Sequence, residues 1–184
     1  MRRFPIILVI VAAFVSGAAT ASNPDLKSMT LRLSDLPAGF TAASSHAKSK
    51  AQLIKDQGYA MPGYVSGWES VFKRSEGFRT AEVDSNVAWY GSAAQAHASM
   101  LDTYQKAAKQ GKKATRVSVG APLGDEARAY KIPGTSGVVV YMVVWRYKNV
   151  KAGILFGGLP SIGTTAEGAT RLADKQQKRI TAAL

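Results

Sequence analysis

Residues 138–147 constrain the fold more than any other part of the chain. They form the longest run of β-branched and aromatic residues, a composition that is enriched in strands because such side chains pack well on a pleated sheet. The run predicts a central strand. Residues 148–149 form a turn into a second apolar run, 150–156, and so close a run predicts an antiparallel hairpin.

Other segments show strand periodicity and turn signals. Residues 68–74 and 81–90 alternate apolar and polar side chains on either side of the turn 75–77, which predicts a second hairpin. A short strand up to Ile132 and a Pro-Gly turn at 133–137 lead into the valine-rich run.

Helices are expected at four places, each with a start or stop signal. They are 23–29, opened by Asn23 and Pro24; 45–57, closed by Gly58; 92–110, with a capping box of Ser92 and Gln95 and a stop at Gly111; and a C-terminal helix with a capping box of Thr164 and Glu167. The helical spacing of the last predicts a buried face of Ala169, Leu172, Ala173, Gln176 and Ile180.

The order of these elements predicts the fold class. Hairpins outnumber possible crossovers, so the chain is expected to be an α+β protein with an antiparallel sheet of about five strands. Helices are expected mainly on one face of that sheet. Residues 22–184 are long enough to form a single domain with its own core.

Residues 1–21 have the pattern of a cleavable secretory signal peptide. Arg2 and Arg3 precede a short apolar run from Phe4 to Val15, and Ala19-Thr20-Ala21 provides small residues for cleavage. The run is too short to cross a bilayer, so no transmembrane segment is expected after cleavage. The mature protein is therefore expected to be secreted, or to lie in the periplasm or cell envelope. Losing Arg2 and Arg3 lowers its net charge from +12 to +10.

Few residues could carry chemistry. The chain has no cysteine, which excludes disulfides, thiolate nucleophiles and zinc–cysteine sites. Neither His46 nor His97 has an acid at a metal-ligand spacing, and no serine lies in a nucleophile-elbow motif. We expect no metal, cofactor or catalytic residue. The glycine-rich segment 153–165 lacks both phosphate-binding motifs, which favours a structural loop.

Positive charge is the strongest chemical signal. Lys109, Lys112, Lys113 and Arg116 follow Lys106 with no acid among them, at the end of a predicted helix and in the loop after it. These four residues are the candidate anion-binding site. An acidic envelope polymer or an anionic membrane surface would be attracted by such a cluster. Nucleic acid is disfavoured, because an exported chain rarely meets it and no basic-aromatic platform is evident.

The aromatic residues allow two interpretations. Several lie at alternating positions in predicted strands: Trp68, Phe72, Trp89, Tyr141 and Trp145. Packing in the core or on a sheet face is their default role. Residues of this kind would instead line an apolar pocket if they faced a cleft between sheet and helices.

Three segments in this order resemble known secreted proteins. They are residues 33–40 (LSDLPAGF), 67–74 (GWESVFKR) and 123–127 (LGDEA). The pattern resembles small secreted bacterial proteins that pair an early D-L-P-x-G-[FW] turn with a later G-D-E-A segment. It is also similar to extracellular sensor domains of bacterial receptor kinases and, more loosely, to the PsbP/Mog1-like α/β sandwich. The resemblance implies a non-catalytic fold and carries over no functional residue.

Three functions remain open from the sequence. The first is an exported, non-catalytic binding or accessory domain of the cell envelope or extracellular space, whose ligand is unknown. The second is an electrostatic binder of polyanionic polymers or anionic membranes. The third is a hydrolase that uses dispersed acids around Asp125 and Glu126. In an extended segment these two adjacent residues would point to opposite faces, and a solvated turn is favoured for them.

Overall fold

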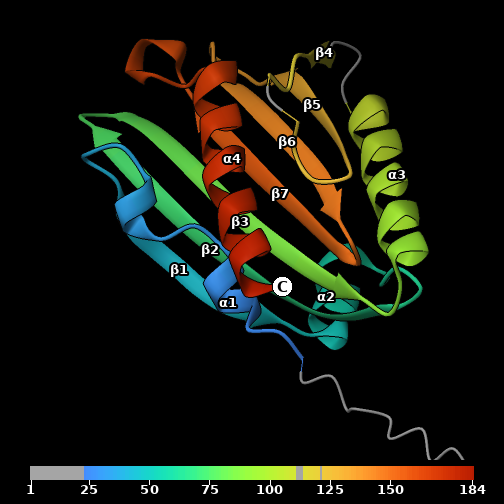
Figure 1. The fold of residues 1–184 in the computed structure, drawn as a ribbon. Coiled ribbons are helices and arrows are strands. Elements are labelled where there is room, and N and C mark those ends of the chain that lie inside the picture. Colours follow the sequence, from blue (N-terminus) through green and yellow to red (C-terminus); the bar gives the residue numbers. More distant parts are fainter. Residues whose placement is uncertain (1–22, 111–113, 121) are drawn as a thin grey trace, which may run out of the picture.

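The computed structural model describes residues 23–110, 114–120 and 122–184, and its centre is a seven-stranded antiparallel sheet (Figure 1). The strand order is β1-β2-β3-β7-β6-β5-β4. The strands are β1 (Thr41–Lys48), β2 (Tyr64–Glu76), β3 (Arg79–Tyr90), β4 (Thr115–Val117), β5 (Glu126–Pro133), β6 (Val139–Tyr147) and β7 (Val150–Gly158). The helices are α1 (Leu26–Met29), α2 (Lys50–Gln57), α3 (Ala93–Gln110) and α4 (Ala166–Ala183), with 3-10 turns η1 (Leu33–Asp35) and η2 (Pro160–Ile162). The expected signal peptide, residues 1–21, lies outside the described residues.

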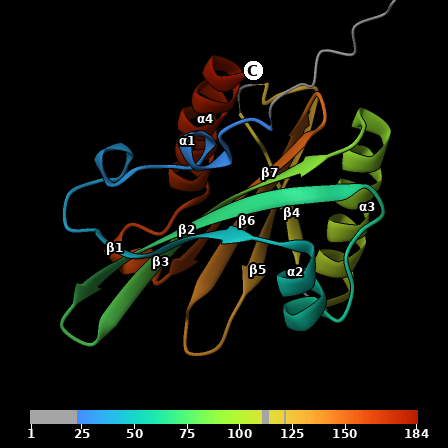
Figure 2. The ribbon, with the colours of Figure 1, turned by 90° about the horizontal axis from the view of Figure 1, so that it is seen from below.

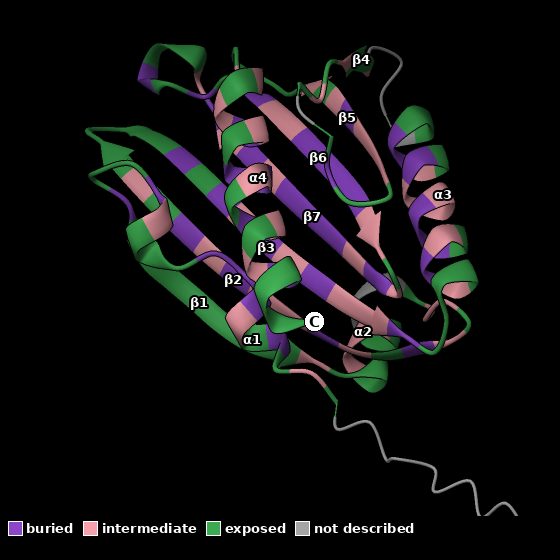
Figure 3. Cartoon of the chain, viewed as in Figure 1, coloured by how far each residue is buried: buried purple, intermediate pink, exposed green. Residues whose placement is uncertain are grey.

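The α+β class and both predicted hairpins are confirmed, but the sheet has seven strands rather than about five. The two missed strands lie at the edges of the sheet. β1 carries mostly small polar side chains and is exposed along almost its whole length, as Figure 3 shows, so it has no alternating apolar pattern to read. β4 spans only three residues.

The predicted helix 45–57 is wrong in its first part. Its first residues belong to β1, and α2 begins only at Lys50, where the Ser49 hydroxyl accepts a hydrogen bond from the Gln52 amide at 3.1 Å. Gly58 ends the helix in the left-handed conformation, as predicted. α4 likewise begins one residue later than expected, with Thr165 rather than Thr164 as its cap.

Helices cover both faces of the sheet, which corrects the expectation of one covered face. Figure 2 shows α1 and α4 on one side and α2 and α3 on the other. Successive residues of a strand point to opposite faces. In β7, Ile154 accordingly belongs to the core shared with α4, whereas Leu155 packs against the cluster around α3.

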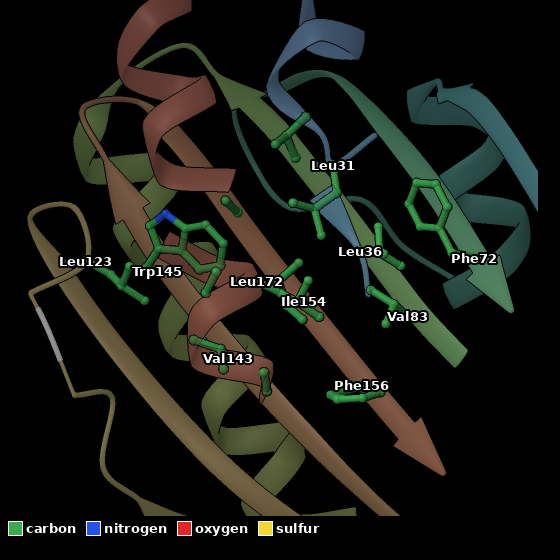
Figure 4. Packing of buried hydrophobic residues seen from close by; sticks show 14 of the residues in the cluster. Leu31, Leu36, Phe72, Val83, Leu123, Val143, Trp145, Ile154, Phe156 and Leu172 are labelled. Carbon is green, nitrogen blue, oxygen red and sulfur yellow. The ribbon is translucent and has the colours of Figure 1, made fainter. Parts of the chain in front are cut away.

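The main core lies between α4 and the sheet. Its largest fully buried side chain is Trp145 of β6, which lies close to Leu172 of α4 and Ile154 of β7 (Figure 4). All five residues of the predicted α4 face are buried: Ala169, Leu172, Ala173, Gln176 and Ile180. The 3.6-residue spacing therefore identified the docking surface of this helix correctly.

A chain of buried hydrogen bonds fixes α4 on the sheet. The Ser85 hydroxyl accepts from the Leu31 amide and donates to the Gln176 side-chain oxygen, both at 2.9 Å. The Gln176 amide nitrogen donates to the Asn86 carbonyl at 2.9 Å. Ser85 and Gln176 are both 0% exposed, so water cannot replace these partners.

We expect Ser85→Ala to lower the free energy of unfolding by about 1–3 kcal/mol, because it strands a buried donor on Leu31 and a buried acceptor on Gln176. Urea denaturation monitored by tryptophan fluorescence measures the change. The matched control is Ser75→Ala, an exposed serine near the end of β2, which should change stability by less than about 0.5 kcal/mol. Equal stabilities of the two variants would contradict the assigned role of Ser85.

Candidate ligand-binding cavity

A cavity of about 860 Å³ lies on the face of the sheet opposite α4. Its floor is formed by β2, β3, β7 and β6, and residues of α2 and α3 form its walls. Small-molecule sites in proteins commonly enclose about 300–1,000 Å³. The cavity is therefore large enough for a small organic ligand.

Small residues line the middle of the floor, and the Asn86 side chain lies over one of them. Gly153 of β7 lines the cavity between its neighbours Asn86 of β3 and Val144 of β6. A Cβ atom at Gly153 would come within 2.9 Å of the Asn86 side-chain oxygen. Ala88, two residues further along β3, also lines the floor with a short side chain.

Lys151 of β7 places an ammonium group in the cavity beneath α3. Its Nζ donates hydrogen bonds to the hydroxyl oxygens of Thr103 at 2.7 Å and Ser99 at 3.1 Å. Burial lowers the pKa of Lys151 from 10.5 to about 8; nearby Asp102 opposes this shift and Lys106 adds to it. The site therefore holds a cation in an environment that disfavours its charge.

Asp102 of α3 links this helix to the segment that follows α2. Its carboxylate accepts a hydrogen bond from the Tyr59 hydroxyl at 2.7 Å and pairs with Lys106 at 2.8 Å. The Lys106 ammonium lies 3.6 Å from the centre of the Tyr59 ring. This carboxylate thus already has a cation and a hydroxyl as partners.

The other end of the floor is acidic. Burial, together with the nearby Glu69 carboxylate, raises the pKa of Asp84 to about 7. Glu69 in turn pairs with Lys48 at 2.8 Å and lies 3.3 Å from His46. Around neutral pH, one carboxyl of this pair holds a proton for a substantial part of the time.

The remaining lining is largely apolar. Methionine and aliphatic side chains come from α2, the segment after it and strands β5 to β7; they are Leu53, Met61, Ile132, Val140, Met142, Val144 and Leu155. A cavity with such walls and a few separated polar groups has the character of a ligand-binding pocket.

The predicted anion-binding residues do not form this cavity. Lys109 is exposed in the last turn of α3, and Arg116 is exposed in β4; neither lines the cavity. Lys112 and Lys113 lie outside the described residues. Their role in anion binding stays a prediction.

Asp125 lies in a bend and Glu126 begins β5, and both bind Arg146 of β6. The contacts are 2.7 Å from Asp125 Oδ2 to Arg146 Nη1 and 2.6 Å from Glu126 Oε1 to Arg146 Nε. Burial of Glu126 opposes ionisation, but hydrogen bonds from Arg146 and His97 outweigh it and lower its pKa. Within the described ranges, no group of three or more His, Asp or Glu side chains could hold a metal ion.

The two short acidic motifs have structural roles. Asp35, in the D-L-P turn, binds the Arg179 guanidinium of α4 through both carboxylate oxygens at 2.8 and 3.0 Å. Gly124 of the G-D-E-A segment has φ +55°, and a Cβ there would lie 2.2 Å from the Arg146 carbonyl oxygen. These motifs thus explain how loops attach to the fold rather than where a ligand binds.

Sequence reasoning missed most of the cavity. Among the aromatic candidates, Phe72 and Trp145 are buried in the α4-side core, and Trp68 packs against that core with Lys27 of α1 over its ring. Lys151 lies outside the predicted basic cluster of Lys109, Lys112, Lys113 and Arg116. A usable signal was present, since Lys151 is a lone charge inside an apolar run and lies two residues before a glycine.

No protein-family model and no curated protein sequence matches the chain. Its fold is similar to the crystal structure of the extracellular domain of PknH from Mycobacterium tuberculosis, with a TM-score of 0.58 and 14% sequence identity. The match covers 83% of this chain and 95% of that chain. The similarity agrees at the level of fold with the resemblance to extracellular sensor domains. None of the helices in the described part of the chain is long and apolar enough to cross a membrane.

We expect Lys151→Met to raise the free energy of unfolding at pH 7 by about 1–3 kcal/mol, because a lysine whose folded pKa is lowered destabilises the fold while it is charged. The unfolded chain binds the extra proton between pH 8 and 10.5. Wild-type stability should therefore rise relative to the variant over that window. Denaturation of both proteins at pH 7, 8, 9 and 10 measures the difference.

The matched control is Lys131→Met, which replaces an exposed lysine of β5. It should change stability by less than about 0.5 kcal/mol at pH 7. A destabilised Lys151→Met protein would show that the ammonium contributes to folding, contrary to this assignment.

Proposed function

We propose that the protein is an exported, non-catalytic binding domain of the cell envelope or extracellular space, and that a small ligand occupies the cavity between α2, α3 and the sheet. The observation that carries the proposal is the cavity itself. It combines about 860 Å³ of space with apolar walls and a few polar groups at separate places.

Two observations support export. Residues 1–21 have the pattern of a secretory signal peptide. The solved structure with a similar fold is an extracellular domain by its title.

The polar groups of the cavity support binding rather than catalysis. Ser99 lies 3.1 Å from the Lys151 amine, a pair of residues that can act as nucleophile and base in hydrolases. Ser99 is, however, 0% exposed, and its hydroxyl also contacts the Tyr90 hydroxyl at 2.6 Å. The Ser99 hydroxyl is thus buried and already hydrogen-bonded to two side chains, unlike the exposed nucleophile of a hydrolase.

The hydrolase hypothesis at the other candidate residues has little support. Asp125 and Glu126 are held by Arg146, and their pairing neutralises the charge that acid–base catalysis would use. The polyanion hypothesis centred on Lys109, Lys112, Lys113 and Arg116 stays a separate proposal. Salt-dependent binding to acidic polymers would be its test.

The cavity proposal predicts saturable binding of a neutral apolar probe. N-phenyl-1-naphthylamine should bind with increased fluorescence, because the lining removes its rings from water. Ala88→Phe should weaken binding at least tenfold by filling the floor. Fluorescence titration of the folded proteins at physiological salt measures both.

The matched control is Ala43→Phe, at an exposed alanine of β1 that does not line the cavity. It should bind the probe as the wild type does. Absence of saturable binding to the wild type, or equal weakening by both substitutions, would refute the cavity as the binding site.

A further inference from the structure

The Lys151 ammonium has a hydrogen-bond donor to spare. A lysine ammonium has three N–H groups, and two of them are used by Thr103 and Ser99. Both partners are neutral hydroxyls. Among the described residues, no carboxylate lies within 4.0 Å of the Lys151 nitrogen, whereas every other ammonium that lines the cavity has one: Lys48 pairs with Glu69, and Lys106 with Asp102.

The acids nearest to Lys151 are bound to other cations. Asp102, which faces it from α3, is shared by Lys106 and Tyr59. Arg146 lies directly opposite Lys151 on β6, and its guanidinium holds Asp125 and Glu126. Such an enclosed positive charge without a counter-ion is unfavourable, and an anion brought by a ligand would offset it.

We propose that the ligand of this cavity is an organic acid with an apolar body, whose anionic group contacts the Lys151 ammonium. This inference deepens the proposed function and rests on it. A carboxylate is the simplest such group, since it can accept the unused N–H of the Lys151 ammonium in a charge-assisted hydrogen bond. The apolar body then follows the floor of the sheet.

Cross-strand rows define the direction of that body. Residues paired across neighbouring strands form rows, and Lys151 lies in a row with Ala88 and Arg146. The next row on the cavity face holds Gly153. The row after that holds Leu155 between Asp84 and Met142. Residues four apart in a strand are separated by about 13 Å. The Asp84 carboxyl is therefore far from the anionic group.

The two sides of the last row differ in charge. Asp84 and Glu69 on β3 and β2 would repel an anion and offer poor surroundings for an alkyl chain. Met142 on β6 and Ile132 on β5 offer apolar contacts instead. We therefore place the apolar body on the β6 and β5 side of the floor, beneath the C-terminal half of α3.

The test compares octanoate with octan-1-ol, two molecules of equal chain length that differ in their head group. Isothermal titration calorimetry on the folded chain at pH 7 and physiological salt should show octanoate binding at least tenfold tighter. Lys151→Met should remove this preference by weakening octanoate binding. Lys131→Met, at the exposed lysine of β5, should leave the preference intact.

Each other outcome overturns the inference. Equal affinities of octanoate and octan-1-ol for the wild type would show that the cavity does not select an acid, and this comparison needs no variant to fold. Retained preference in Lys151→Met would place the anion elsewhere. Absence of octanoate binding also refutes the inference, and the neutral-probe titration then decides separately whether the cavity proposal fails with it.

Discussion

The structure depends on the burial of β7 between two helical layers. β7 pairs with β3 on one side and β6 on the other, so its backbone hydrogen bonds are satisfied within the sheet. On the α4 face, Val150, Ala152 and Ile154 are 0% exposed. This contact removes apolar surface from water and supplies the main stabilisation of the fold.

The opposite face of the same strand carries different chemistry. Lys151, Gly153 and Leu155 alternate with the core residues and face the α3 side, where the cavity lies. Glycine removes side-chain volume, and lysine introduces a charge that burial disfavours. Both reduce packing or stability locally, as is common where a protein keeps a binding site. The apolar contact on the α4 face offsets this local loss of stability.

The cations that hold the fold together form ion pairs, whereas the lysine that we assign to ligand binding does not. Arg146 holds the Asp125–Glu126 loop, and Arg179 holds the turn at Asp35. Each of these ion pairs joins segments that are distant in sequence. In each, the carboxylates neutralise the guanidinium that they bind. Lys151 differs because its partners are neutral hydroxyls. The distinction between fold and site thus rests on how each charge is neutralised.

Much of the fold could be predicted from the sequence, because those features depend on local periodicity. The α4 face from Ala169 to Ile180 followed from helical spacing, and both hairpins followed from alternation and turn residues. The edge strands escaped detection for the same reason. β1 is solvent-exposed and needs no apolar pattern, so its residues gave no strand signal.

The candidate site could hardly be predicted, because its residues come from distant parts of the chain. Ser99 and Lys151 meet only through the packing of α3 on β7, and Asp84 approaches Glu69 only through the pairing of β2 with β3. By itself the sequence determined an α+β chain of antiparallel hairpins with an amphipathic C-terminal helix. Only the tertiary structure decided which face of the sheet stays open and which lysine is enclosed there, since burial depends on elements that local sequence cannot place.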